Sequence, residues 1–312
     1  MRQDTGWESA RFHLCLRQGA GRQFAWLQVG SGKAALPRST HQRVTLTVGW
    51  LLSTINRILM KSITLETLKR IVDVNGKLDG WNFSRVRAGR DPVPWDYVDV
   101  VRQYIKPSDR VLDIGTGGGE IFFSLAPYFS EGIGIDQNSA MIETARQNQS
   151  AQSIDNISLM RMDGSDLQFD VDEFDIVLLR HLRVYVNEIV RVLRHHGYFI
   201  AQMVGQRSSI NILDAFAWKP SSFGEDWWQT VTDLAYQFRL HGCQIIAQAE
   251  YDVPYWFHDL ESFMFWLMSV PWPEDIELDK HWQNIKRILE TSQTERGIET
   301  NEHRGLLIVQ KL

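Results

Sequence analysis

One acid and a cluster of glycines offer the clearest chemistry in this chain. The run 111–120 reads VLDIGTGGGE, and its candidate ligand-binding residues are Asp113, Gly115, Gly117 and Gly119. Glycine adopts backbone angles that other residues avoid, and its missing Cβ lets a ligand approach the main chain. An apolar helical pattern follows the run. The sequence therefore predicts a strand, a ligand-binding turn and a helix.

Two more acids follow the next two expected strands. Asp136 ends the segment 132–136, and Asp163 ends the segment 157–163 and is followed by Gly164 and Ser165. A carboxylate at the first position can accept hydrogen bonds from both hydroxyls of a ribose, and one at the second can accept from an adenine amino group. A single acid of this kind is often a helix cap or a turn residue. Acids at three successive strand ends after a glycine loop predict a nucleoside-containing cofactor.

A dinucleotide-binding Rossmann domain is the main alternative, because it also places glycines between a first strand and a helix. Its third small residue permits close helix packing beside a bound pyrophosphate. Counted from Gly115, that position is Glu120. A bulky carboxylate there disfavours a diphosphate and is compatible with a cationic cofactor.

These motifs resemble the cofactor loop of class I S-adenosylmethionine-dependent methyltransferases. Residues 62–312 look like the stand-alone bacterial methyltransferase-domain group (type 11/25-like). The segments that carry this resemblance are 111–120, 132–148, 180–193, 197–205, the Pro-Trp insert at 270–273 and 302–304. The group usually has Lys-Pro-Gly-Gly before strand five, where this chain has RHHG at 194–197. The resemblance implies S-adenosyl-L-methionine as cofactor and methyl transfer as reaction.

Strands and helices alternate along the chain, which predicts a doubly wound α/β sheet with helices on both faces. The expected strands are 110–114, 132–136, 157–163, 174–180, 198–204, 243–250 and 305–311. The expected helices between them include 139–148, 187–194 and 227–240. The resemblance implies a Rossmann-like, seven-stranded methyltransferase sheet whose last strand is antiparallel. Ligands of such sheets bind at the carboxyl ends of the strands.

Aromatic residues gather in two places outside this alternation. An N-terminal cap is expected over 60–108, and an aromatic, lid-like insert between strands six and seven over 258–303. Most of these side chains are expected to pack the core, and a few to face a substrate. The candidates for the substrate pocket are Trp81, Trp95, Arg180, Trp256 and Trp266.

His181 follows strand four, whose end usually faces the methyl acceptor in this fold. An imidazole titrates near neutral pH, so His181 is the candidate catalytic base. A structural role at the strand end is the alternative. The Asn/Asp-Pro-Pro-aromatic signature of enzymes that methylate nucleobase amines is absent from this position. Alignment of the reactants alone can supply about 7–11 kcal/mol of barrier reduction.

The whole-chain composition is that of a soluble globular protein, with 312 residues, 44% hydrophobic and 23% charged. Two cysteines give neither a disulfide framework nor a metal-ligand cluster, so we expect no metal and a cytoplasmic setting. Residues 1–59 contain eight basic and two acidic residues, although the chain carries a net charge of −5. We expect them to be poorly ordered or a non-native extension, with the methyltransferase domain at 60–312. A transit peptide is the alternative.

The sequence favours a small-molecule acceptor, without naming the acceptor atom or the oligomeric state. The net negative charge argues against a nucleic-acid partner, and no apolar run predicts a membrane span. RNA methylation, with Arg85, Arg87 and Arg90 contacting phosphates, is one alternative. A catalytically idle cofactor-binding protein is another.

Overall fold

The computed structural model describes residues 11–18, 21–28, 63–75, 83–223 and 229–312. Strands β1 (Arg11–Gln18) and β2 (Gly21–Gln28) pair as an antiparallel hairpin. Phe12, Leu14 and Leu16 alternate with other residues along β1, which is the period-2 pattern of a strand. The expected boundary at Met60 lies outside the described residues.

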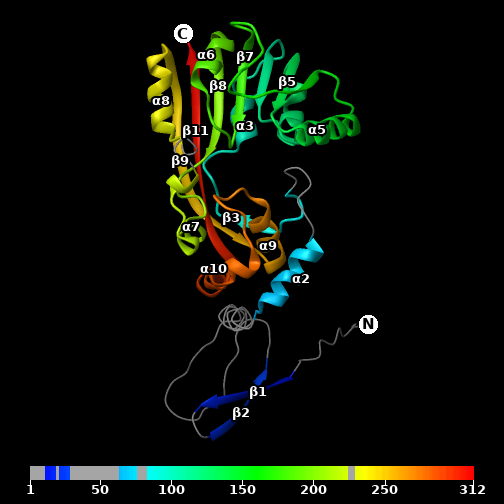
Figure 1. The fold of residues 1–312 in the computed structure, drawn as a ribbon, viewed down its shortest axis with the longest axis vertical. Helices are drawn as coiled ribbons and strands as arrows, with labels where there is room; N and C mark the ends of the chain where they lie inside the picture. The colour runs from blue at the N-terminus through cyan, green and yellow to red at the C-terminus, as the bar shows by residue number, and fades with distance from the viewer. Residues whose placement is uncertain (1–10, 19–20, 29–62, 76–82, 224–228) are drawn as a thin grey trace, which may run out of the picture.

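One large mixed sheet organises the rest of the chain (Figure 1). Its order is β3-β9-β11-β8-β7-β4-β5-β6, and β10 pairs with β11. The parallel strands are β4 (Arg110–Ile114), β5 (Glu131–Asp136), β6 (Ile157–Arg161), β7 (Phe174–Arg180) and β8 (Leu193–Val204). The antiparallel strands are β3 (Ala88–Arg90), β9 (Cys243–Phe257), β10 (Gln293–Thr294) and β11 (Gly297–Lys311). The doubly wound α/β sheet with an antiparallel last strand is confirmed, and β3 and β10 add to the seven expected strands.

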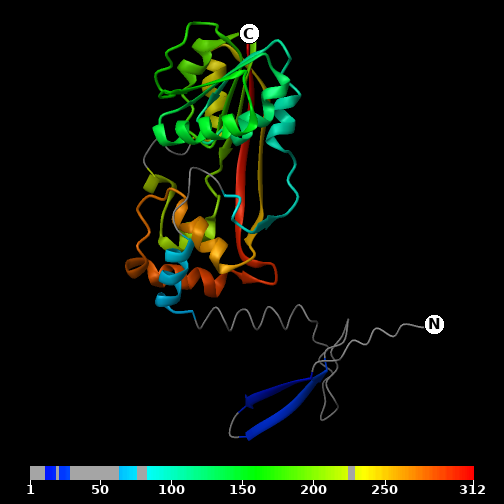
Figure 2. The same ribbon diagram turned by 90° about the vertical axis from the view of Figure 1, so that its right-hand side faces the viewer.

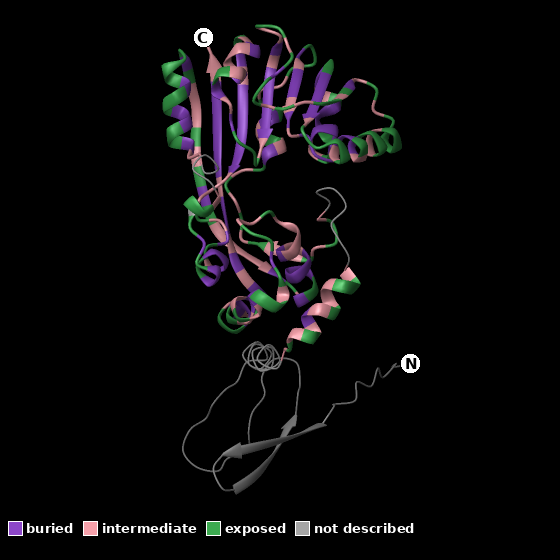
Figure 3. Cartoon of the chain, in the orientation of Figure 1, coloured by how far each residue is buried: buried purple, intermediate pink, exposed green. Residues whose placement is uncertain are grey.

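Helices cover both faces of this sheet, because successive residues of each strand point to opposite sides. On one face, α6 (Val186–Val192) and α8 (Val231–Leu240) pack against Leu112, Val177 and Phe199. On the other face, α3 (Tyr97–Arg102), α4 (Glu120–Leu125) and α5 (Ser139–Gln152) pack against Val111, Leu178 and Ile200. Figure 3 shows the central strands buried and the outer sides of α5 and α8 exposed.

A second hydrophobic core lies at the far end of the two longest strands (Figures 1 and 2). It contains residues of α2 (Leu65–Asn75), α7 (Ile210–Phe216), α9 (Leu260–Ser269) and α10 (Leu278–Thr291). Phe257 of β9 and Ile298 of β11 are both buried in it. The cap and the insert are therefore joined by one core. Among the described helices, none is long and apolar enough to cross a lipid bilayer.

Several element boundaries differ from those expected. β9 continues to Phe257 and β11 begins at Gly297, because Ile298 to Thr300 pair with the aromatic run 255–257. β8 already begins at Leu193, where the chain leaves the helix, so α6 is shorter than expected. α8 begins at Val231, since the side chain of Thr230 accepts a hydrogen bond from the Asp233 main-chain N–H at 3.0 Å and caps the helix.

Candidate active site

A cavity of about 800 Å³ lies where the carboxyl ends of β4, β5, β7 and β8 meet the second core. Its acidic lining comes from Asp113, Glu120 and Asp136, beside Gly115 to Gly118. Its basic lining comes from Arg180, His181, Arg183 and Arg304. The remainder is largely apolar, contributed by residues such as Leu213, Tyr255, Trp266 and Trp272. The acids and glycines lie at or just after the ends of β4 and β5, whereas the apolar residues belong to the second core. The cavity therefore has an acidic half and an apolar half.

The glycine loop has the backbone conformation that only glycine adopts readily. Gly115 and Gly117 have φ angles of +76° and +56°, in the left-handed region. A Cβ at Gly115 would collide with the side chain of Leu182. The main-chain N–H of Gly115 donates to the Ile135 carbonyl at 2.8 Å and fixes the loop to β5. The loop therefore presents bare main chain to the cavity.

Asp136 is the last residue of β5 and joins the two strand ends. Its Oδ2 accepts a hydrogen bond from the Gly117 N–H at 3.1 Å, and its Oδ1 accepts one from the Asn138 N–H at 2.9 Å. A carboxylate has about four acceptor sites, so both oxygens keep capacity for a ligand. The main-chain contacts hold the carboxylate in place at the cavity wall.

Asp113 lies beneath the glycine loop, at the end of β4. Burial raises the pKa of its carboxyl to about 6, against the opposing effects of Thr116 and the Arg180 guanidinium. The carboxylate is thus costly to maintain without a cationic partner. A bound cation would relieve that cost.

The other residues expected to bind the cofactor lie outside the lining of this cavity. Gly119 begins α4 with φ +83°, and a Cβ there would collide with the Phe123 ring. Asp163 is exposed two residues after β6 and accepts hydrogen bonds from the main-chain N–H and hydroxyl of Ser165, both at 2.8 Å. These bonds lower the pKa of Asp163. Gly164 packs toward Ile114, and Ser165 lines a second, smaller cavity.

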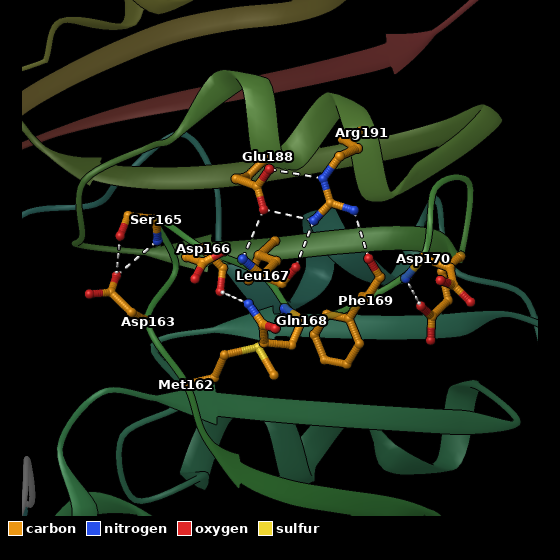
Figure 4. A network of polar contacts seen from close by, with 11 residues as sticks. Met162, Asp163, Ser165, Asp166, Leu167, Gln168, Phe169, Asp170, Glu188 and Arg191 are labelled. Carbon is orange, nitrogen blue, oxygen red and sulfur yellow. Dashed lines mark hydrogen bonds and ion pairs between the residues drawn. The ribbon is translucent and has the colours of Figure 1, made fainter.

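The segment after Asp163 is fixed to α6 by a network of charged hydrogen bonds (Figure 4). Glu188 accepts a hydrogen bond from the Leu167 main-chain N–H at 2.8 Å and from Arg191 at 2.7 and 2.9 Å. Arg191 in turn donates to the carbonyls of Leu167 and Phe169 at 2.7 and 2.6 Å. The network positions the loop that carries Asp163 and Ser165.

His181 reaches the cavity directly after β7, in the left-handed conformation with φ +58°. Desolvation by the protein and the guanidinium groups of Arg304 and Arg180 hold its pKa well below 6.5, although part of the residue is exposed. Its side chain is therefore neutral at pH 7, although it is a weak base.

The expected pocket aromatics divide between the cavity and other surfaces. Trp266 and Arg180 line the cavity. Trp95 instead donates its indole N–H to Gln202 at 3.0 Å, and Trp256 packs under the Arg296 guanidinium at 4.2 Å from the ring centroid. Trp81 lies outside the described residues. Sequence reasoning missed Tyr255, Trp272 and Arg304 as lining residues. For Arg304, a usable signal was a charged side chain directly before the apolar run 305–309 of a strand in the sheet's centre.

The chain resembles known proteins in family, in individual relatives and in fold. Residues 105–291, more than half of the chain, match the family model of a methyltransferase domain. The uncharacterized methyltransferase YcgJ of Bacillus subtilis is 34% identical over 98 residues, which cover 29% of this chain and 39% of that protein. The ubiquinone/menaquinone biosynthesis C-methyltransferase UbiE of Zymomonas mobilis is 30% identical over 118 residues, covering 36% of this chain and 48% of that protein. The chain thus spans less than half the length of these two relatives.

Solved structures share the fold at low sequence identity. The crystal structure of Bacillus subtilis YcgJ gives a TM-score of 0.52 at 18% identity and covers 69% of this chain and 97% of that one. A putative methyltransferase from Bacillus halodurans gives 0.54 at 15% identity and covers 69% and 98%.

Proposed function

Because the chain belongs to the methyltransferase-domain family, we propose that it transfers a methyl group from S-adenosyl-L-methionine to a small molecule in this cavity. The observation that carries the proposal is the presence of the glycine loop, Asp113 and Asp136 in the lining of a single cavity. When bound, the donor supplies a methyl group on a sulfonium centre, which is open to attack by a nucleophile.

The acidic half of the cavity suits such a donor in both shape and charge. Bare main chain at Gly115 and Gly117 gives room for the methionine portion, and Asp113 pairs with its ammonium group. Asp136 accepts hydrogen bonds from the ribose hydroxyls with its remaining acceptor capacity. Asp163, Gly164 and Ser165, on the loop fixed by Glu188, lie outside the lining of this cavity and would contact only a part of the donor that extends beyond it. The ammonium group and the ribose hydroxyls of the donor can pair with Asp113 and Asp136, and no diphosphate is needed.

The other half of the cavity suits a small, partly apolar acceptor. Tyr255, Trp266 and Trp272 supply flat surfaces against which such a molecule can pack. The arginines that would serve an RNA substrate are engaged by the chain itself. Arg87 pairs with Asp259, and Arg90 with Glu302 at 2.8 Å. Arg85 donates to the Asn75 carbonyl at 3.0 Å. These contacts favour a small molecule over RNA.

His181 is, in this proposal, the group that accepts a proton from the acceptor. It is neutral at pH 7 and faces the cavity. Its depressed pKa makes it a modest base, so orientation of the acceptor by the cavity walls supplies most of the rate enhancement.

The test is transfer of isotope-labelled methyl from S-adenosylmethionine to separated fractions of a bacterial extract. We expect label in the low-molecular-weight metabolite fraction with the wild-type protein, and none with Asp136→Ala. Label that appears only in RNA, or that appears equally with the variant, would contradict the proposal.

A further inference from the structure

Two arginines flank the end of strand β8 within the cavity. Arg180 on β7 pairs in register with Gln202, and Arg304 on β11 pairs with Val204, two residues further along β8. Both side chains line the cavity. They therefore present two guanidinium groups at one end of the sheet.

The charge of these two arginines is incompletely balanced by the protein. Arg304 donates to the Ser208 hydroxyl at 3.1 Å and reaches Glu302 at 3.4 Å. That carboxylate is shared, because it also accepts from Arg90 at 2.8 Å and from the Tyr251 hydroxyl at 2.6 Å. A single buried acid thus serves two cations and a phenol.

Arg180 has even fewer partners. The described residues offer its guanidinium no hydrogen bond, and its Nε atom is buried without a partner. Its Cζ atom lies 5.3 Å from the centroid of the Tyr97 ring. Its charge also acts on Asp113, which the donor's ammonium group would engage in the proposed function. A buried donor without an acceptor is costly, so a ligand atom that accepts from Arg180 would stabilise the site.

We propose that the methyl acceptor is a largely apolar molecule bearing a carboxylate, which Arg180 and Arg304 bind beside Tyr255, Trp266 and Trp272. This inference rests on the proposed function and adds the substrate class. Guanidinium groups bind carboxylates through paired, charge-assisted hydrogen bonds. The carboxylate anchors the acceptor and leaves another atom of the molecule to receive the methyl group.

The methionine portion of the donor also bears a carboxylate. The order of the strands, however, favours the acceptor as the molecule whose carboxylate the two arginines bind. The glycine loop follows β4, whereas Arg304 is on β11, with β7 and β8 between them. Three strand spacings separate the two main chains by about 14 Å. An anion bound by both arginines is therefore centred away from the glycine loop.

The experiment uses the full chain saturated with S-adenosylhomocysteine, and measures binding of indole-3-acetate and its neutral analogue indole-3-acetamide by calorimetry. The variants are Arg180→Gln and Arg304→Gln, with Arg180→Lys to keep the charge. Arg239→Gln, exposed on α8 and outside the cavity lining, is the matched control. Thermal unfolding checks each variant, and if Arg304→Gln does not fold, Arg180→Gln decides the test.

We expect the wild type and Arg239→Gln to bind the acid at least tenfold more tightly than the amide. Both glutamine variants should lose that preference, and Arg180→Lys should retain part of it. The affinity for S-adenosylhomocysteine should change less than twofold in Arg304→Gln, whose guanidinium does not act on Asp113. Equal binding of acid and amide, or no binding of the acid, would overturn the inference. So would an Arg304→Gln variant that binds S-adenosylhomocysteine tenfold more weakly yet binds 5′-methylthioadenosine, which lacks the whole amino-acid portion, normally. Failure of the wild type to bind S-adenosylhomocysteine at all would instead remove the proposed function.

Discussion

The main-chain N–H of Gly117 donates to the Asp136 carboxylate across 3.1 Å, so the glycine loop and the end of β5 form one unit. The same carboxylate also receives the Asn138 N–H at 2.9 Å, at the start of α5. The carboxylate is therefore held in position before any ligand binds, which reduces the entropy lost on binding.

Gly115→Ala should impair donor binding more than it impairs folding. The substitution forces a left-handed φ of +76° on alanine and brings its Cβ into collision with Leu182, which lines the cavity. Gly242→Ala is the matched control, because Gly242 has the same φ of +76° and no atom near its Cβ position. Both variants should lose about 1–2 kcal/mol of unfolding free energy to the backbone strain, measured by urea denaturation. Only Gly115→Ala should lose affinity for S-adenosylhomocysteine, by tenfold or more; equal affinities would refute this account of the loop.

Asp113→Asn should stabilise the protein at pH 7.5 and abolish donor binding. Burial raises the pKa of Asp113 to about 6, so the folded state holds this proton more tightly than the unfolded state. Ionisation therefore lowers the stability of the wild type as pH rises above its unfolded pKa, and the full cost is present above about pH 6. The variant should be more stable by up to about 3 kcal/mol at pH 7.5, and this advantage should shrink toward pH 4. A difference in unfolding free energy that does not vary with pH would contradict the raised pKa.

His181 should remain neutral well below the usual imidazole pKa. Because its pKa is lowered, the unfolded state binds a proton near pH 6.5 before the folded state does, and stability falls as pH decreases below that value. The imidazole signal in an NMR titration should stay in its neutral form at pH 6. Once an acceptor is identified, kcat can be measured. His181→Ala should reduce it at least about 100-fold, because the residue that takes the proton is then missing. An unchanged kcat would leave His181 a structural role only.

Glu188→Gln should loosen the loop that carries Asp163 and Ser165. Its carboxylate joins Arg191 to the Leu167 N–H through hydrogen bonds of 2.7–2.9 Å. Loss of such charged hydrogen bonds costs about 1.5–3 kcal/mol. Glu143→Gln is the control, because its ion pair with Arg146 at 4.0 Å is exposed and should contribute under about 1 kcal/mol. Urea denaturation that shows equal losses for the two variants would rule out a special role for the network.

Local sequence signals predicted the elements that build the cofactor half of the cavity. β4 and β7 have the expected bounds, because each is a short apolar run that ends at polar residues and a turn. The glycine loop and the acids at the ends of β4 and β5 also lie together, since parallel strands bring their carboxyl ends to one edge.

The residues of the acceptor half could not be predicted from local patterns, because their placement depends on the pairing of strands that are far apart in the sequence. Tyr255 and Trp256 are neighbours on β9, and only the former lines the cavity, because adjacent strand residues face opposite sides. Which one faces inward depends on the pairing of β9 with β11, whose partners lie about 45 residues away in the sequence. The same pairing places Arg304 in the site, although it is far from the glycine loop in the sequence.

The most direct test of the central claim is calorimetric titration of the full chain with S-adenosylmethionine and S-adenosylhomocysteine, with NAD as the control ligand. We expect micromolar binding of both sulfur ligands, no comparable binding of NAD, and loss of the sulfur ligands in Asp136→Ala. Tighter binding of NAD, or no binding of either sulfur ligand by a folded protein, would contradict the assignment of this cavity to a methyl donor.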